Sequence, residues 1–592
     1  MQPLVRHLVK GIGLVAIFAA ISAASALLLA WFSRWFLRRE RVGLPPGATF
    51  IQAVARSFGE LARRKKLAVA AVFVVCLFSR VALIPVLGIP APLAHDEFSY
   101  LLAGDTFAHG RLTNPTPPLW PFFESIHINM RPTYMSMYPP GQGFLLAIGE
   151  WLGHPWMGVL LSAALGCALI CWMLQAWLPP SWALLGGVIA ILQFGILSYW
   201  TNTYYCTWIV VIGGALVLGA WPRLRKHPRA SSALLLALGV ALLALTRPYE
   251  GLFFCLPVAI ALLAWLFARR GPSLGVALSR GLAPLLISMA ALAAFLGYYN
   301  WRVSGNALVM PYQINQSTYA GVPLFPWQHE KTQPVYRNAQ MRDYYAQWAI
   351  SGYRHSMARG PAFMAWAKIK TYWRFYFGWF LTLPLLALPW VVRDRRIRFL
   401  VVVTAVTALG LELELWSHPH YAAALTGALV AIMVQGLRHL RLWRWQGKAV
   451  GRMAVWAVVL GLFAFDAAWI SAAAVRVNSS SLYWVGNQDR ADLQNRLQHM
   501  PGLQLVIVRY SPAHPVFREW VYNRADIEHA KVVWARDMGT ACNGELIRHF
   551  KDRRVWLVQP DTQPPQLTAY PVAAASLVEG RTPAGCGWSE LP

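Results

Sequence analysis

Long apolar runs alternate with short polar segments through most of the chain. A helix needs roughly 20 mainly apolar residues to cross a bilayer, and many of these runs approach that length. The expected spans are 10–32, 67–88, 156–178, 182–199, 205–221, 231–246, 252–268, 280–300, 373–392, 399–416, 420–437 and 452–473. The pattern therefore predicts an all-α polytopic membrane protein with about 12 transmembrane helices.

The polar segments between alternate runs carry most of the positive charge. Their Lys and Arg clusters lie at 38–41, 63–66, 223–229, 269–280, 393–398 and 438–448. The positive-inside rule makes these clusters cytoplasmic. The loops at about 89–155 and 301–372, and everything after 474, are then expected on the extracytoplasmic side. The orientation of the first run stays open, because residues 10–32 could also be an uncleaved signal anchor.

The segment after residue 473 has a different pattern. Its short β-like runs are Leu503–Tyr510, Lys531–Arg536 and Arg553–Val558. Polar helical segments alternate with them, at Gln488–His499 and Glu545–Lys551. This alternation predicts a small α/β domain.

Three parts are expected along the chain. They are an N-terminal transmembrane helix with a basic linker (1–66), a membrane-embedded body (67–473) and an extracytoplasmic α/β domain (474–592). An oxidising compartment would permit a disulfide between Cys542 and Cys586 in the last part, and the sequence leaves that pairing open.

Composition excludes several classes of function. The chain has 592 residues, 57% of them hydrophobic, and a formal net charge of +28. Because the positive charge lies between apolar runs, it is read as a topological signal, and no nucleic-acid partner is expected. The sequence contains no P-loop, GxGxxG, CxxC pair or HExxH motif, which argues against nucleotide-driven transport and zinc hydrolysis.

The main candidate for chemistry is the acidic pair Asp96-Glu97, which follows the second expected span. Carboxylates are costly near hydrocarbon and usually serve a proton, an ion or a substrate there. The alternative is that the two acids only mark where the helix leaves the bilayer. Residues 96–109 have apolar positions near helical spacing, which predicts an amphipathic helix along the membrane surface. The apolar segment Phe144–Leu152 is too short to span and is expected in the interface.

Basic and aromatic groups gather at the expected outer ends of other spans. They are Arg247 and Glu250 after span six, Lys368, Lys370 and Arg374 before span nine, and His418, His420 and Tyr421 between spans ten and eleven. A carboxylate facing several cations suits base-assisted transfer from a lipid phosphate. The alternatives are headgroup anchors for the cations, a buried ion pair between Arg247 and Glu250, and turn positions for the histidines.

The loop at 301–372 is rich in Tyr, Trp, Gln, Asn and Arg. Such side chains suit contact with sugars, and they equally suit a belt at the lipid headgroups. Glu412 and Glu414 fall inside the tenth span, where they either pair with a basic neighbour or line a polar cavity.

Four motifs resemble one family of enzymes. They are HDEFSY at 95–100, YPPGQG at 138–143, TRPYEG at 246–251 and SHPHY at 417–421. The stretch from about 67 to 437 resembles the GT-C glycosyltransferases, and within them the protein O-mannosyltransferase and aminoarabinose transferase group with its bacterial family 39-like members. The resemblance implies an inverting transferase with a polyprenyl-phosphate sugar donor, an extracytoplasmic site and a glycan, glycolipid or protein acceptor. It places the enzyme in the bacterial inner membrane.

The resemblance also implies roles for individual residues. The family's catalytic aspartate corresponds to Asp96, with Glu97 beside it. The donor phosphate is expected at Arg247, Lys370, Arg374 and His420. The residues expected to line the substrate are His95, Tyr100, Tyr138, Gln142, Glu250, His418 and Tyr421.

One position departs from the family pattern. Several relatives have a second acid in the outer turn after the fourth span, whereas this chain has Asn202 there. Because Mg²⁺ and Mn²⁺ favour clustered carboxylates, a catalytic metal is possible but disfavoured. Arg and Lys can neutralise a phosphate leaving group alone, so no cofactor is expected.

Two other functions compete with glycosyl transfer. A transporter or lipid flippase would use ionisable residues at mid-depth of several spans. Most charge lies at span ends, with Glu412, Glu414 and Asp466 as exceptions. A structural or assembly protein would use the C-terminal segment as its working part.

Overall fold

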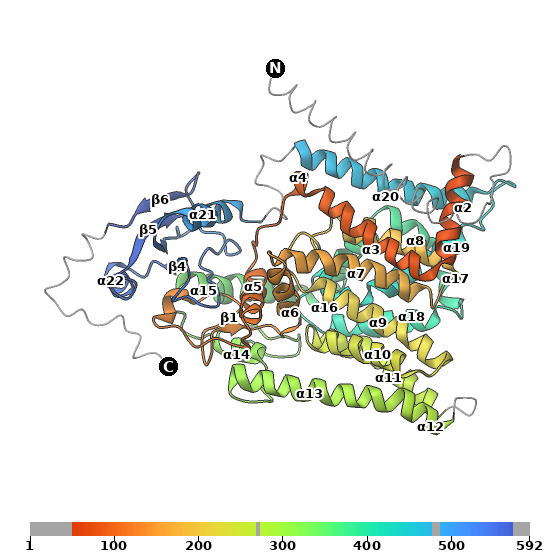
Figure 1. Cartoon of the computed structure of the whole chain (residues 1–592), viewed down its shortest axis with the longest axis horizontal. Coiled ribbons are helices and arrows are strands. Elements are labelled where there is room, and N and C mark those ends of the chain that lie inside the picture. Colours follow the sequence, from red (N-terminus) through yellow and green to blue (C-terminus); the bar gives the residue numbers. More distant parts are fainter. Residues whose placement is uncertain (1–49, 268–272, 476–485, 572–592) are drawn as a thin grey trace, which may run out of the picture. The chain divides into compact units, whose positions relative to one another are not determined.

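The computed structural model of the chain describes residues 50–267, 273–475 and 486–571 (Figure 1). They divide into two compact units. Unit 1 lies within Met1–Pro90, Trp156–Ala294 and Pro361–Trp484, and unit 2 lies within Ala91–Pro155, Phe295–Gly360 and Val485–Pro592. The first expected span, 10–32, lies outside the described residues.

Unit 1 is helical. Its elements are α2 (Phe50–Arg63), α3 (Lys65–Ala82), α4 (Ile84–Leu87), α7 (Trp156–Leu174), α8 (Pro180–Ala190), the π-helix η2 (Ile191–Gly195), α9 (Thr207–Lys226), α10 (Ala230–Ala244), α11 (Pro248–Leu266), α12 (Leu274–Ala277), the π-helix η3 (Leu278–Leu282), α13 (Ala283–Ser304), α16 (Ile350–Tyr376), the 3₁₀-helix η5 (Phe380–Ala387), α17 (Leu388–Arg393), α18 (Arg398–Glu412), the 3₁₀-helix η6 (Pro419–Leu425), α19 (Thr426–Leu440) and α20 (Val450–Val475). Helices α13 and α16 continue into unit 2.

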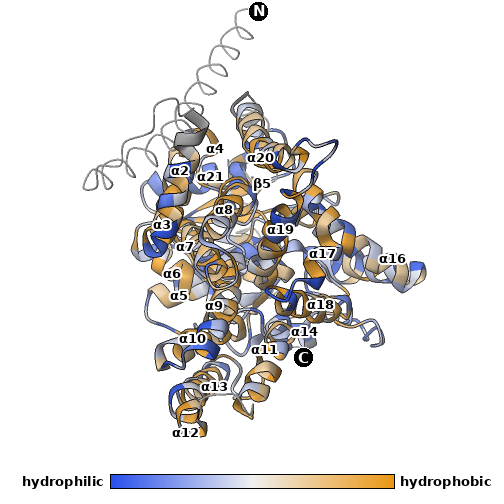
Figure 2. Ribbon diagram, turned by 90° about the vertical axis from the view of Figure 1, so that its right-hand side faces the viewer, coloured by the Kyte–Doolittle hydropathy of each residue, from blue (hydrophilic) through white to orange (hydrophobic). Residues whose placement is uncertain are grey.

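The helices of unit 1 differ in how much of their surface other helices cover. The apolar windows of α9 and of η6–α19 are 89% buried, whereas that of α12–α13 is only 6% buried. Figure 2 colours most of the helical ribbon of this unit as hydrophobic. Side chains such as Ile287 and Leu460 stay 70% and 59% exposed, which suits contact with lipid. The chain is a multi-pass membrane protein.

The predicted number of about 12 spans is not confirmed. Six helices in the described part of the chain are long and apolar enough to cross a membrane, or seven if a bent pair counts as one span. Among the other expected spans that lie in the described ranges, α8, α10 and α18 are helical but shorter, and α3 carries three charged residues, Lys65, Lys66 and Arg80.

The expected span 373–392 is broken. The helical segments Ala339–Tyr376 and Phe380–Arg393 meet at a bend of 109°. Gly378 at this break has φ +53°, a left-handed conformation that glycine adopts without steric cost and that ends a helix.

Unit 2 is built on a four-stranded sheet. Its strands are β3 (Leu503–Val508), β4 (Val532–Arg536), β5 (Arg553–Gln559) and β6 (Gln566–Ala569), in the order β4-β3-β5-β6. The first three strands are parallel and β6 is antiparallel. Strands β3 to β5 and helix α21 (Gln488–His499) lie where the sequence pattern predicted them, and α22 (Thr540–His549) begins earlier than expected. Cys542 in α22 is disulfide-bonded, and Cys586 lies outside the described residues.

Segments from both long loops pack with this sheet. They are α5 (His95–Ala108), the 3₁₀-helix η1 (Trp120–Phe123), β1 (Ile128–Asn129), β2 (Met135–Ser136), α6 (Gly141–Trp151), α14 (Pro311–Thr318), α15 (Ala339–Arg342) and the π-helix η4 (Asp343–Ala349). One sheet face shares a core with α5 and η1. The other shares a core with α21. Unit 2 thus joins the two long loops to the C-terminal segment.

The expectation that residues 96–109 form a helix on the membrane surface is wrong in one respect. The helix exists as α5, but it is buried on nearly all sides within unit 2. Phe98 stacks on Tyr522 with 3.8 Å between ring centroids, and Asp105 accepts hydrogen bonds from Arg524. On another side, α6 lies so close that a Cβ at Gly143 would stand 2.6 Å from the Phe107 ring. The polar face of α5 is covered by a segment some 400 residues later in the chain, which periodicity cannot reveal.

Candidate functional site

Asp96 and Glu97, adjacent in sequence, have different environments at the start of α5. Glu97 is 2% exposed, and its Oε1 accepts hydrogen bonds of 3.1 Å from the amides of Leu93 and Ala94. This is the N-terminal capping arrangement that fixes where a helix begins. The side chain of Asp96 is 27% exposed and points out of that cap. Glu97 therefore holds the helix start, and Asp96 is accessible.

The side chains of His127 and Tyr138 hold the Asp96 carboxylate. Nδ1 of His127 lies 2.7 Å from Oδ1, and the Tyr138 hydroxyl donates a short hydrogen bond to the same oxygen. Burial and the neighbouring carboxylate raise the pKa of Tyr138 well above its usual value, so its hydroxyl remains a donor. The Tyr344 hydroxyl lies 3.1 Å from Nε2 of His127. The pattern is satisfied when Tyr344 donates to Nε2 and Nδ1–H donates to Asp96.

A small hairpin brings His127 and Tyr138 to Asp96. Strands β1 and β2 pair antiparallel, so the residue before the first strand and the residues after the second lie at the same end. The hydroxyl of Ser99 on α5 bonds to the His127 carbonyl and to Ser136, each at 2.7 Å. His127 has φ +63°, a conformation that costs a non-glycine residue about 1–3 kcal/mol and clusters at functional sites.

His95 is fixed inside unit 2. It is 2% exposed, with Nε2 2.6 Å from the Val516 carbonyl and Nδ1 2.7 Å from the Tyr522 hydroxyl. The carbonyl requires a proton on Nε2, so Nδ1 accepts from the tyrosine and the ring is neutral. Burial, with a smaller effect from His127, lowers the pKa of His95 to about 4. These contacts anchor α5 to the C-terminal segment.

The other expected loop residues also lie within unit 2. Tyr100 stacks on Tyr138 with 4.5 Å between ring centroids, so it supports the ring that bonds Asp96. Gln142 is 1% exposed on α6. Five of the residues expected in the first loop thus lie on or against α5, and Gln142 lies on the helix packed against it.

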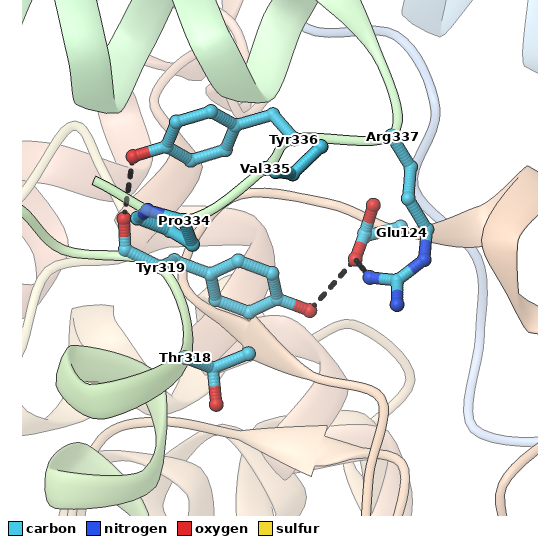
Figure 3. Close-up of a pocket in the computed structure, with 7 residues that line it drawn as sticks. All are labelled: Glu124, Thr318, Tyr319, Pro334, Val335, Tyr336 and Arg337. Atoms are coloured by element: carbon cyan, nitrogen blue, oxygen red, sulfur yellow. Dashed lines mark hydrogen bonds and ion pairs between the residues drawn. The ribbon is translucent and has the colours of Figure 1, made fainter. Parts of the chain in front are cut away.

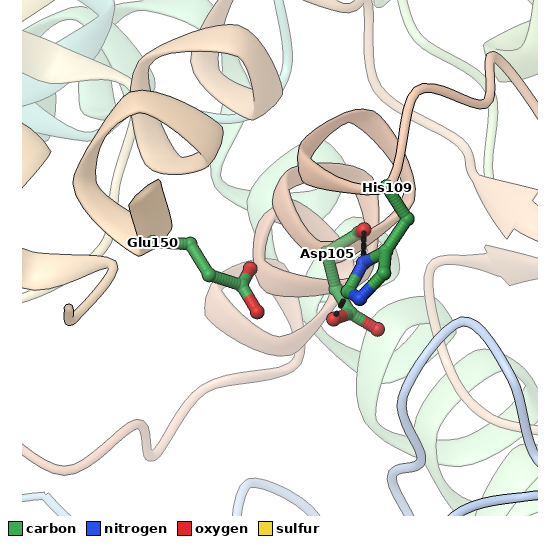
Figure 4. Close-up of side chains that lie close together, drawn as sticks. All are labelled: Asp105, His109 and Glu150. Atoms are coloured by element: carbon green, nitrogen blue, oxygen red, sulfur yellow. Dashed lines mark hydrogen bonds and ion pairs between the residues drawn. The ribbon is translucent and has the colours of Figure 1, made fainter. Parts of the chain in front are cut away.

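Asp105, His109 and Glu150 could in principle hold a metal ion, since their ligand atoms lie within 4.8 Å of one another (Figure 4). The Arg524 guanidinium already bonds both carboxylates, at 3.0 Å from Nε to Asp105 and by a shorter contact to Glu150. Although burial acts to raise it, the hydrogen bonds from Arg524 lower the pKa of Asp105. The cluster is an arginine-centred ion-pair network.

In unit 1, Arg247 stands just before α11 and is already engaged. Its NH1 lies 2.9 Å from Oε1 of Glu250, which is 5% exposed, and its guanidinium lies 4.1 Å above the Tyr421 ring. The alternative of a buried ion pair is therefore confirmed. A phosphate at Arg247 would compete with Glu250.

His418 and His420 extend this cluster. Their rings stack at 5.4 Å between centroids, and Tyr421 lies 4.9 Å from His420. Nδ1 of His420 lies 3.0 Å from the Tyr199 hydroxyl. The SHPHY and TRPYEG motifs thus form one contiguous group of side chains.

Lys368 differs from Lys370 and Arg374, the two basic residues that follow it in α16. It is 4% exposed, and its ammonium donates to the carbonyls of Leu411, Glu412 and Glu414 at 2.6–3.1 Å. These carbonyls end α18, so Lys368 caps that helix. Glu412 also lies 3.7 Å from the ammonium, which favours the alternative of pairing with a basic neighbour.

Lys370 and Arg374 line a cavity of about 810 Å³ at the break after α16. Its other walls are Gln193, Trp366, Ile369, Trp373, Phe377, Gly378, Trp379, Phe380, Leu462 and Phe465. Both cations are exposed, and neither makes an ion pair or side-chain hydrogen bond with another residue of the described ranges. The arrangement suits an amphiphile that has an apolar chain and an anionic head.

Asn202, where the family resemblance leads to the expectation of an acid, lies in a buried turn. Its Oδ1 accepts from Nε and NH2 of Arg80 at 3.0 and 2.8 Å, and its amide donates to two backbone carbonyls. Arg80 is fully buried and stacks on Trp156. Asn202 therefore serves as a partner of Arg80.

Comparisons with known proteins give structural matches and no sequence matches. No family model matches the chain, and no curated protein matches its sequence. The chain is similar at low sequence identity to solved structures of two other proteins. ArnT from Cupriavidus metallidurans in the apo state has a TM-score of 0.42 and 14% identity, over 87% of this chain and 96% of that chain. The Archaeoglobus fulgidus oligosaccharyltransferase with a tethered acceptor peptide has a TM-score of 0.37 and 12% identity, over 83% of this chain and 68% of that one.

Sequence reasoning missed His127 and Tyr344. His127 lies in a loop without periodicity, and Tyr344 is one of many aromatics in 301–372. The only signal was a histidine placed between the two best motifs, HDEFSY and YPPGQG.

Proposed function

We propose that the chain is an inverting membrane glycosyltransferase that moves a sugar from a polyprenyl-phosphate donor to an acceptor hydroxyl on the extracytoplasmic side. Asp96 acts as the general base. The observation that carries the proposal is the division between Asp96 and Glu97. Glu97 caps a helix, whereas Asp96 is accessible and is held by His127 and Tyr138.

In the proposed reaction, the acceptor oxygen attacks the anomeric carbon while its proton passes to the Asp96 carboxylate. The bond between the anomeric carbon and the phosphate oxygen breaks, and polyprenyl phosphate leaves with the electron pair. A hydrogen-bonded aspartate is a weak base, so its fixed position contributes more than basicity. His127 and Tyr138 supply that position.

The leaving phosphate gains negative charge, which cations stabilise. Lys370 and Arg374 are proposed for this role, because they line an aromatic cavity large enough for part of a lipid chain. Arg247 is proposed to act beside the SHPHY histidines, where Glu250 and Tyr421 fix it. The proposal needs no metal.

The test compares the two adjacent acids in a strain from which the gene has been deleted. Wild type, Asp96→Asn and Glu97→Gln are returned to that strain, and mass spectrometry measures the missing modification in its glycan and glycolipid fractions. We expect transfer to be lost only with Asp96→Asn, whose amide oxygen can still accept from His127 and Tyr138. Wild-type turnover by Asp96→Asn would overturn the proposal. Uptake of a substrate by proteoliposomes without sugar transfer would favour a transporter.

A further inference from the structure

Unit 2 contains a second pocket, separate from Asp96, of about 240 Å³. Its walls are Glu124, Thr318, Tyr319, Pro334, Val335, Tyr336 and Arg337 (Figure 3). The volume lies below the roughly 300–1,000 Å³ of pockets for drug-sized ligands, so it has room for one small ring. The rim is open, because Val335 is 77% exposed.

A carboxylate and a guanidinium stand together in this pocket. Glu124 is 1% exposed, and NH1 of Arg337 lies 3.6 Å from its Oε1 (Figure 3). The Tyr319 hydroxyl donates to the same oxygen at 2.9 Å, and the Asn338 amide donates to Oε2 at 3.2 Å. The pair presents a hydrogen-bond acceptor beside a fork of donors.

The charge in the pocket is balanced, which restricts the ligand. An anionic ligand would stand against the Glu124 carboxylate, and a cationic ligand would stand against the Arg337 guanidinium. Adjacent hydroxyl groups of an uncharged ligand can both donate and accept, so they can bond to Glu124 and Arg337 at the same time. The electrostatics therefore favour an uncharged polyol.

Flat tyrosine rings supply the apolar part of the wall. The Tyr336 hydroxyl donates to the Tyr319 carbonyl at 2.8 Å, which ties the two wall segments together (Figure 3). Both rings stack against Tyr345, at 5.8 and 6.2 Å between centroids. A pyranose ring has a face of C–H groups that packs on such rings and a rim of hydroxyls that bonds to polar side chains.

The same aromatic cluster reaches Asp96. Tyr345 contacts Tyr344 at 4.9 Å between ring centroids, and Tyr344 bonds to His127, which bonds to Asp96. A series of ring contacts and hydrogen bonds within unit 2 thus connects the pocket to the proposed base.

We infer that the pocket at Glu124, Tyr319 and Arg337 binds a single uncharged pyranose ring. The further statement that this ring belongs to the glycan of the acceptor rests on the proposed function. The binding itself does not, because it requires neither a donor nor Asp96.

The experiment is saturation-transfer NMR on the full chain in lipid nanodiscs, since maltoside detergents are themselves pyranosides. The probes are the methyl α-glycosides of glucose, mannose and galactose, with glucuronate and glucosamine as charged comparators. Val335→Trp and Thr318→Trp fill the pocket from exposed positions, and Leu308→Trp, 88% exposed elsewhere in unit 2, is the matched control.

We expect transfer to at least one neutral glycoside, weakened at least about tenfold by either filling variant and unchanged in the control. The absence of a saturation-transfer signal from all three neutral glycosides would overturn the inference. Binding that persists in both filling variants, or that is confined to a charged sugar, would also overturn it. The same measurement on Asp96→Asn should give the wild-type signal. Loss of transfer and loss of sugar binding are therefore separate results.

Discussion

Asp96 in unit 2 and Lys370 in unit 1 each lie close in sequence to a residue of the same charge that is buried at a helix end. The charge is negative in unit 2 and positive in unit 1. In unit 2, Glu97 is buried against backbone amides, whereas Asp96 stays accessible. In unit 1, Lys368 is buried against backbone carbonyls, whereas Lys370, two residues later, lines a cavity. In each unit, one charged side chain completes the end of a helix, and a neighbour of the same sign is available to a ligand.

The two regions differ in what holds the available groups. Asp96 is held by a tyrosine and a histidine, neither of which carries a permanent charge. Arg247 is held by the opposite charge of Glu250, so much of its positive charge is already neutralised. Sequence position alone does not distinguish a group kept for a ligand from one that stabilises a helix end. The partners of each group do.

Among variants that keep Asp96, the largest expected effect comes from removing the two available cations. Lys370→Gln with Arg374→Gln removes two charge-assisted contacts to the phosphate, each worth about 1.5–3 kcal/mol, so kcat/KM for transfer should fall at least about 100-fold. Arg395→Gln with Arg396→Gln removes the same charge from exposed positions of unit 1 and should change little. The measurement is transfer from a polyprenyl-phosphate sugar in nanodiscs. Equal losses in the two double variants would mean that the cavity has no special role.

The second prediction concerns His95 and the pH dependence of stability. Its folded pKa of about 4 lies below the ordinary value of about 6.5, so below pH 6.5 the unfolded chain binds a proton that the folded protein does not. Stability should therefore fall from pH 6.5 towards pH 4, by about 3 kcal/mol in full from this group. The difference in melting temperature between wild type and His95→Gln, followed from pH 7.5 to 4.5, measures this contribution. Replacement of His329, an exposed histidine of unit 2 that makes no ion pair within the described ranges, should leave the profile unchanged. A difference that does not vary with pH would contradict the neutral, buried histidine.

Several features of the fold could be predicted from sequence because they depend on local periodicity. The apolar runs appear as helices throughout the described ranges, and β3, β4, β5 and α21 match the pattern of the C-terminal segment. Span length was less predictable, since the break at Gly378 and the π-helix at 191–195 shorten or bend helices inside apolar runs.

The candidate site was predictable only where a motif carried it. Asp96 was found because acids are unusual at a membrane exit. The sequence did not predict that Glu97 differs in role from Asp96, or Lys368 from Lys370. These roles depend on which backbone groups lie at a helix end. His127 needed the β1–β2 pairing, which rests on four residues and leaves no periodic signal.

The third prediction tests whether His127 positions Asp96. His127→Gln removes the contact to Oδ1 and should lower kcat at least about tenfold while KM stays near its wild-type value, since a hydrogen bond to a charged group contributes about 1.5–3 kcal/mol. Tyr344→Phe removes only the hydroxyl that orients the histidine and should have a smaller effect of the same kind. A rise in KM with unchanged kcat would assign His127 to substrate binding instead.

The smallest effect is expected at Glu97, and it is the sharpest test of the comparison between the two acids. Glu97→Gln keeps an oxygen that can accept from the amides of Leu93 and Ala94 but loses the charge, so unfolding free energy should fall by about 1 kcal/mol with transfer nearly unchanged. Asp96→Asn should show the reverse, with stability kept and transfer lost. Thermal melting and transfer rates, measured on the same preparations, separate the two outcomes. If Glu97→Gln loses transfer without losing stability, the helix cap is not its main function, and both acids belong to the chemistry.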